Sequence, residues 1–207
     1  MSITLDPGEQ RTLLRNIAWH TFLDLCEQRE GSVPRMTYDR GELELMSPRR
    51  QHEELGCFIG RLIETFTEVK EIDIRSVAST TFKRHDLTRA FEADESYYIE
   101  NVEPIWRKEE VDLSIDPSPD LVVEVELTSS AIAKMPLFAA MGVPEVWRHD
   151  GKSLCMLSLV SDEYQAIDES VQLPGLTTDM IDSVLSKRFE VGETQLIRGF
   201  RQRLETS

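Results

Sequence analysis

Two carboxylates near the middle of the chain are spaced for metal or acid–base chemistry. Glu124 and Glu126 alternate with valine and leucine over residues 120–127, so on a β-strand both side chains point to the same side, about 7 Å apart. On a central strand such charges need a partner, because an unpaired buried carboxylate costs several kcal/mol. That partner is either a divalent cation or an arginine or lysine. On an edge strand, the same alternation describes a face that is exposed to water.

Lys134 follows these carboxylates, eight residues after Glu126 and near the start of an expected helix. A lysine at this place can fold back over the carboxylates, where its charge would orient a water molecule and stabilise negative charge on a phosphate. The alternative is an exposed surface lysine, which is the usual state of this residue type.

His52 and Glu53 lie at the start of the clearest helical pattern, in which apolar residues recur every three or four positions from Leu55 to Val69. The pair Ser47-Pro48 is predicted to cap this helix. At 100° per residue, His52 falls about 60° from the centre of the apolar face, whereas Glu53 falls nearly opposite it. His52 can therefore face a sheet, either as a metal ligand or as a hydrogen-bonded core histidine.

Acidic residues outnumber basic ones. The chain has 207 residues, with 38 Asp and Glu against 23 Lys and Arg and a formal net charge of −15. Twelve of the acids, with only two basic residues, fall between Glu92 and Glu126, and for residues 100–116 a solvated face is the simple alternative. This charge excludes a strongly basic exterior for nucleic acids. DNA remains a candidate partner only through local basic groups, at Arg49-Arg50, Lys83-Arg84-His85 and Arg89.

Composition also bounds the class of protein. With 40% hydrophobic and 29% charged residues, a chain of this length can bury a core of its own. Its three cysteines lie far apart without a C-x-x-C pair, which is typical of reduced thiols. No run of about 18 apolar residues and no secretory leader occur in the sequence, so we expect a cytoplasmic protein without membrane contact.

The elements that must position these side chains are a mixture of helices and strands, which predicts a single α/β or α+β domain. Residues 1–10 are polar and expected to be loosely held. In the segment after Ser129-Ser130, Pro136 indicates either a kinked helix or a helix that begins near the proline. Helices are expected over residues 17–25, 48–69, 131–141, 177–189 and 193–204. Strands are expected over 33–38, 42–46, 72–77, 80–82, 96–99, 121–127, 145–148, 153–160 and 163–167.

Several of these segments occur in the order found in a known family. They are Glu42–Pro48 with His52-Glu53, Glu92–Tyr98, Pro119–Glu126, Ser129-Ser130, Lys134 and Gly142–Trp147. Over roughly residues 15–190 the chain resembles the Uma-two family of putative restriction endonucleases, which is assigned to the PD-(D/E)-x-K nuclease fold. The resemblance implies a restriction-endonuclease-like central mixed sheet flanked by helices. It also implies a nuclease-like domain over 15–190, between a polar segment over 1–14 and a C-terminal helix over 191–207.

The resemblance implies roles for individual residues. Asp94 matches the first metal-binding aspartate, although Ala93 stands where the family commonly has proline, and Glu124 matches the second acidic ligand. The wider fold places a lysine two residues later, where this chain has Glu126, so Lys134 is the candidate for a relocated lysine. The expected catalytic residues are therefore Asp94, Glu124 and Lys134, and the expected metal ligands are Asp94, Glu124, Glu126 and His52.

These observations support three functions. The first is a Mg²⁺- or Mn²⁺-dependent endonuclease that hydrolyses phosphodiester bonds in DNA. The second is a catalytically inactive nuclease-fold module for interaction or dimerisation, favoured by Glu126 in the lysine position and by the acidic charge. The third is a carboxylate-pair hydrolase acting on sugars, which rests on the acidic pair and on Trp19, Trp106 and Trp147.

The apolar residues of the C-terminal helix bear on assembly. They can supply the self-complementary surface of a homodimer, or they can pack on their own domain. They are Leu196, Ile197, Phe200 and Leu204.

Overall fold

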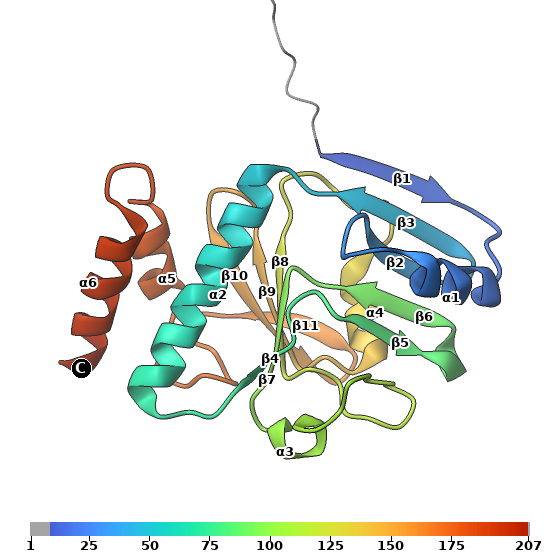
Figure 1. Cartoon of the computed structure of the whole chain (residues 1–207). Helices are drawn as coiled ribbons and strands as arrows, with labels where there is room; N and C mark the ends of the chain where they lie inside the picture. The colour runs from blue at the N-terminus through green and yellow to red at the C-terminus, as the bar shows by residue number, and fades with distance from the viewer. Residues whose placement is uncertain (1–8, 207) are drawn as a thin grey trace, which may run out of the picture.

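The computed structural model describes residues 9–206 and contains two β-sheets with helices packed around them (Figure 1). The smaller sheet is antiparallel, and its strands follow the order β1 (Gln10–Leu14), β3 (Glu42–Ser47), β2 (Arg35–Asp39), β6 (Arg89–Glu92) and β5 (Thr81–Arg84). The larger sheet has the order β11 (Glu163–Ile167), β10 (Leu154–Val160), β9 (Glu145–His149), β8 (Leu121–Val125), β7 (Glu95–Tyr98) and β4 (Arg75–Ser76). The larger sheet is mixed, because β8 and β9 run parallel while its other pairs are antiparallel.

Helices cover both faces of the larger sheet. The helices are α1 (Trp19–Gln28), which packs on the smaller sheet, and α2 (Arg50–Lys70), α3 (Val102–Ile105), α4 (Lys134–Met141), α5 (Thr178–Leu185) and α6 (Glu193–Glu205), with a 3-10 turn, η1 (His85–Leu87). In Figure 1, α2 crosses the front of the larger sheet and α6 packs against α2. Helix α4 lies on the opposite side of that sheet. The expected mixed sheet flanked by helices is confirmed.

Strand β8 lies at the centre of the larger sheet, between β7 and β9. Its five residues are all buried. Leu121, Val123 and Val125 join the core under α2, whereas Val122 packs with Phe138 on the side of α4. The alternation therefore describes a central strand with both faces covered, and the edge-strand alternative is wrong.

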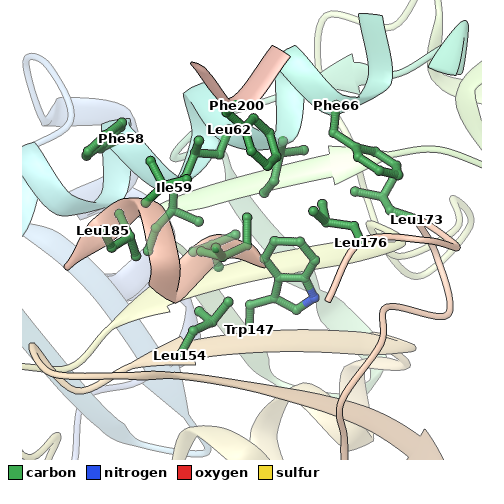
Figure 2. Packing of buried hydrophobic residues seen from close by; sticks show 14 of the residues in the cluster. Phe58, Ile59, Leu62, Phe66, Trp147, Leu154, Leu173, Leu176, Leu185 and Phe200 are labelled. Atoms are coloured by element: carbon green, nitrogen blue, oxygen red, sulfur yellow. The ribbon is translucent and has the colours of Figure 1, made fainter. Parts of the chain in front are cut away.

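The largest core cluster lies between α2, α5, α6 and one face of the larger sheet. Figure 2 shows Trp147 of β9 beneath Ile59 and Leu62 of α2, with Leu185 and Phe200 closing the cluster from α5 and α6. The four apolar residues of α6 that could have formed a dimer surface are at most 8% exposed. They pack on their own domain, so the second of the two alternatives for this helix is the one observed.

The expected cap of the long helix is wrong. Ser47 is the last residue of β3, where it pairs with Gln10 of β1, and α2 begins only at Arg50. Because Ser47 belongs to a β-ladder, its side chain is not placed at a helix N-terminus. Of the two alternatives for Pro136, the structure shows a helix that begins near the proline. Helix α4 begins at Lys134, and Pro136 lies in its first turn, where a missing N–H breaks no helical bond.

Two strands of the smaller sheet were not expected from the sequence. Residues 1–8 lie outside the described part of the chain, but Gln10–Leu14 pair with β3 along their whole length. Arg89–Glu92 form β6 between β2 and β5. Within residues 9–206, no helix combines the length and apolar character needed to cross a lipid bilayer.

Candidate active site

Glu124 and Lys134 meet at the end of β8. Lys134 Nζ, in the first turn of α4, donates a hydrogen bond to Glu124 Oε2 at 2.5 Å. The other carboxylate oxygen, Oε1, is buried and has no hydrogen-bond partner in the described residues. A cavity of about 210 Å³ opens beside the pair, lined by Glu124, Glu126, Ser130, Ile132, Ala133, Lys134, Met135, Pro136 and Arg148. The alternation predicts that Glu124 and Glu126 point to the same side of the strand, and Lys134 and the cavity lie on that side.

Asp94 lies just before β7, one strand away, and its carboxylate is held on both oxygens. Oδ1 lies 2.7 Å from His52 Nε2 and also contacts the Arg35 guanidinium. Oδ2 accepts a hydrogen bond from the backbone N–H of Val125 at 2.5 Å. Because Val125 directly follows Glu124, the Asp94 carboxylate reaches the same end of β8 that carries the Glu124–Lys134 pair.

Glycines on α2 let the helix approach these strands. A Cβ at Gly56 would be 3.6 Å from the Asp94 Cβ, an ordinary contact. A Cβ at Gly60, one turn further, would be 2.8 Å from the Tyr97 hydroxyl oxygen, which is too close without movement of the ring. The absence of a side chain at Gly60 therefore allows α2 to lie close to Tyr97 of β7.

His52 faces the sheet, as the helix geometry predicts, and is 1% exposed. Burial lowers its pKa to about 4, an effect that the Glu9 carboxylate opposes and the Arg35 guanidinium reinforces. The imidazole is therefore neutral at pH 7. Glu53, which the same geometry places away from the sheet, forms an ion pair with Arg35 at 2.8 Å.

Glu95 is a further titratable group beside Asp94. Burial, together with the nearby Glu64 carboxylate, raises its pKa to about 7. Its carboxyl carbon lies on the side of α2, where a Cβ at Gly60 would be 3.4 Å away. Glu95 thus faces α2, whereas Glu124 faces α4.

One carboxylate oxygen at this end of β8 has no partner among the described residues and is free for a hard divalent cation. Within residues 9–206, no three acidic, histidine or cysteine side chains come together as a complete metal site. Mg²⁺, however, is commonly bound by one or two carboxylates, with water and substrate phosphate as its other ligands. The unpartnered Oε1 of Glu124 supplies one such oxygen beside the cavity. Asp94 is the second carboxylate that the family resemblance assigns to a metal, and Arg35 and His52 contact it in this structure.

The structure brings the predicted residues together as two pairs. His52 contacts Asp94 and Lys134 contacts Glu124, and the Asp94 carboxylate also accepts from the N–H of Val125, the residue that follows Glu124. Asp94 and His52 do not line the cavity next to Glu124. Glu126 lies in that lining, where its carboxylate pairs with the Arg148 guanidinium at 3.0 Å. The metal-binding and catalytic roles of these residues remain predictions.

Three charged residues that the sequence did not single out hold the site. Arg35 binds Asp94 and Glu53, Glu9 binds His52, and the buried Glu44 accepts hydrogen bonds from the loop between β8 and α4. Glu44 stood within the motif that carried the family resemblance and alternates with leucines on its strand. That alternation is the signal that could have identified it. Arg35 and Glu9 have no comparable local signal.

Other residues weighed in the sequence lie away from this site. Arg84 donates a hydrogen bond to the carbonyl of Ala140, at the opposite end of α4 from Lys134, so it does not border the cavity. The three tryptophans belong to different regions, because Trp147 is in the main core, Trp19 packs in the smaller sheet and Trp106 is exposed. The three tryptophans therefore do not form one surface beside the acidic pair.

Comparisons with known proteins agree with this fold and motif order. A crystal structure described as a putative nuclease belonging to DUF820 from Anabaena variabilis ATCC 29413 superimposes with a TM-score of 0.54 at 16% identity. The match covers 89% of this chain and 99% of that one. No curated protein matches the sequence. The family model Uma2, described as putative restriction endonuclease, matches residues 19–182. Because this match spans more than half of the chain, including Asp94, Glu124 and Lys134, the chain belongs to the Uma2 family of putative restriction endonucleases.

Proposed function

We propose that the chain is a Mg²⁺-dependent endonuclease that hydrolyses phosphodiester bonds in DNA. The family and the nuclease fold support this class of activity. The observation that carries the proposal is the end of β8, where Lys134 contacts one oxygen of Glu124 while the other oxygen is unpartnered among the described residues. A lysine, a carboxylate with a free lone pair and open space on one side of a strand suit phosphoryl transfer.

Asp94 and Glu124 would hold the cation, with His52 and Glu126 as neighbouring candidates. When bound, the cation supplies a Lewis acid that stabilises the negative charge developing on the phosphate oxygens. Manganese suits the same oxygen ligands and serves as a substitute in experiments. Lys134 contributes a second positive charge on the side of α4, within reach of a phosphate in the cavity.

Arg148 gives the cavity a third positive group. Its side chain is 44% exposed and its guanidinium pairs with Glu126, so it can exchange this carboxylate for a phosphate oxygen without leaving the cavity lining. With a net charge of −15, the chain has few other means of attracting DNA. We therefore expect weak non-specific affinity and a strong dependence of binding on salt.

A cleavage assay tests this proposal. Supercoiled plasmid is incubated with the wild type, Asp94→Asn and Glu27→Gln, each with Mg²⁺, with Mn²⁺ and with EDTA. Glu27 is an exposed carboxylate on α1 and provides the matched control. We expect cleavage by the wild type and by Glu27→Gln with metal, and none by Asp94→Asn or in EDTA. Metal-dependent cleavage that survives Asp94→Asn would contradict the assignment.

A second candidate function is an inactive nuclease-fold interaction module, and one contact favours it. The Arg35 guanidinium lies against Asp94 Oδ1, so a protein cation neutralises a carboxylate that the first proposal assigns to a metal. In this alternative Arg35 is a permanent partner of Asp94. Arg35→Gln distinguishes the two functions, because removing a permanent partner destabilises the fold and creates no activity. In the endonuclease, the same variant changes the metal concentration needed for cleavage.

A further inference from the structure

The segment leading into β1 enters the candidate site, although it precedes the residues matched by the family model. Glu9, the residue before β1, has a fully buried side chain. Its Oε2 lies 3.0 Å from His52 Nδ1, and its Oε1 accepts a hydrogen bond from the Thr128 hydroxyl. His52 belongs to α2 and Thr128 to the loop between β8 and α4, so a single carboxylate joins the two segments that carry the site. Figure 1 shows the start of β1 beside the first turn of α2.

The contact with His52 continues to Asp94. His52 Nε2 lies 2.7 Å from Asp94 Oδ1. A neutral imidazole donates to only one of two carboxylates, and the Arg35 guanidinium, which contacts both His52 Nε2 and Asp94 Oδ1, completes the link from Glu9 through the ring to Asp94. With both nitrogens held, the ring can neither rotate nor tilt freely. A carboxylate on the far nitrogen of a histidine is the arrangement by which proteins commonly orient histidines beside metals.

Arg11 extends the same support to the other half of the site. It binds Glu9 Oε1 through Nη2 at 2.8 Å and Glu44 Oε1 through Nη1 at 2.7 Å. Glu44 in turn accepts hydrogen bonds from the Ser130 hydroxyl and the Ala131 N–H, at 2.9 and 2.5 Å. These residues lead directly into α4, so β1 holds the loop that delivers Lys134 as well as the histidine that touches Asp94.

We propose that Glu9 is a positioning residue that keeps the Asp94 side and the Lys134 side of the site in register for a divalent cation. This inference rests on the proposed function, because it assigns Glu9 to the same cation site. Without the Glu9 carboxylate, the His52 ring and the loop at Thr128 each lose a fixed contact. The chain still folds around its main core and Asp94 keeps its contact with the N–H of Val125, but no single carboxylate then holds both the His52 ring and the loop at Thr128.

Calorimetric titration of the full chain with Mn²⁺ tests the proposal. The variants are Glu9→Gln and, as a matched control, Glu42→Gln. The control removes an exposed ion pair between Glu42, at the start of β3, and Arg15, which follows β1. We expect Glu9→Gln to raise the Kd for Mn²⁺ by about 10- to 100-fold. Glu42→Gln should stay within roughly twofold of the wild type. Equal affinities of Glu9→Gln and the wild type would overturn the proposal.

Two further measurements keep the test decisive. If Glu9→Gln does not fold, Thr128→Val removes the hydrogen bonds of the loop to Glu9 and Arg11 and leaves the Glu9–His52 contact in place. A rise in Kd of several-fold supports the proposal, and an unchanged Kd overturns it. Nitrogen-15 NMR of the His52 ring in metal-free protein reports the Glu9 contact without any cation. If the wild type binds no Mn²⁺, the proposed function fails. Ring signals that are identical in Glu9→Gln and the wild type then reject the positioning role separately, and changed signals uphold the contact.

Discussion

Glu124 and Glu145 lie on the neighbouring strands β8 and β9, and both are buried, yet their carboxylates have different surroundings. Glu145 accepts four hydrogen bonds from neutral donors, which are the Trp147 indole, the Ser170 hydroxyl and the N–H groups of Val171 and Gln172. Glu124 has one partner, Lys134, and one oxygen without any in the described chain. The first carboxylate is closed to ligands, whereas the second keeps a lone pair free beside a cavity.

Two other buried carboxylates resemble Glu145. Asp120 accepts hydrogen bonds from the N–H groups of Ile99 and Asn101 and from the Asn101 amide. Glu92 binds Arg29 through both oxygens and also accepts from the Met36 N–H. Fixed donors of this kind stabilise loops and strand ends, because a buried carboxylate is tolerated only when it is well hydrogen-bonded. Among these four buried carboxylates, Glu145, Asp120 and Glu92 hold the fold, and in the described part of the chain Glu124 alone keeps an oxygen available to a ligand.

The largest expected effect is on activity, at Glu124. Glu124→Gln keeps an oxygen that can accept from Lys134 but removes the negative charge, so we expect metal-dependent cleavage to fall about 1000-fold, equivalent to about 4 kcal/mol in the barrier. The free energy of unfolding should change by less than about 1 kcal/mol. Cleavage rates and urea denaturation of the same preparations check both statements. A variant that cleaves normally, or one that is strongly destabilised, would remove Glu124 from the class of ligand-binding carboxylates.

Glu145 should show the opposite behaviour. In Glu145→Gln the amide nitrogen faces donors instead of accepting from them, so we expect the unfolding free energy to fall by about 3 kcal/mol. The rate of cleavage per folded molecule should be unchanged. Urea denaturation measures the first effect, and cleavage normalised to the folded fraction measures the second. A loss of activity without a loss of stability would contradict the comparison.

How much of this could be predicted depends on the range of the contacts. The face of Glu124 and the approach of Lys134 follow from local periodicity and short sequence separation, and the structure places the two side chains in contact. The Glu9–His52 contact joins residues 43 positions apart. It depends on the pairing of β1 with β3, which polar residues 1–10 gave no reason to expect. Ser47 was misassigned for the same reason, since that pairing draws it into a strand.

The smallest expected effect concerns the change of stability with pH, to which a buried histidine contributes. His149 is the last residue of β9, the strand that carries Glu145. Its Nδ1 accepts from the Gly151 N–H, and burial lowers its pKa to about 4. An unfolded histidine has a pKa near 6.5, so below that pH the unfolded state takes up a proton that the folded state refuses. The contribution to stability is complete above pH 6.5 and is lost as the pH falls towards 4. Between pH 7 and 5 we expect a loss of about 2 kcal/mol.

Denaturation of the wild type and His149→Asn at pH 7 and pH 5 measures this term. The carboxylates and His52 are common to both proteins, so the difference between their pH dependences isolates His149. We expect the variant to lose less stability on acidification than the wild type. Equal losses would show that His149 does not carry the effect.

The central claim is that Glu124 is available to a divalent cation and Glu145 is not. Calorimetric titration with Mn²⁺ of the wild type, Glu124→Gln and Glu145→Gln tests it most directly, with each protein shown to be folded at the temperature used. We predict binding by the wild type and by Glu145→Gln, and no binding by Glu124→Gln. Unchanged binding by Glu124→Gln, or no binding by the wild type, would contradict the claim.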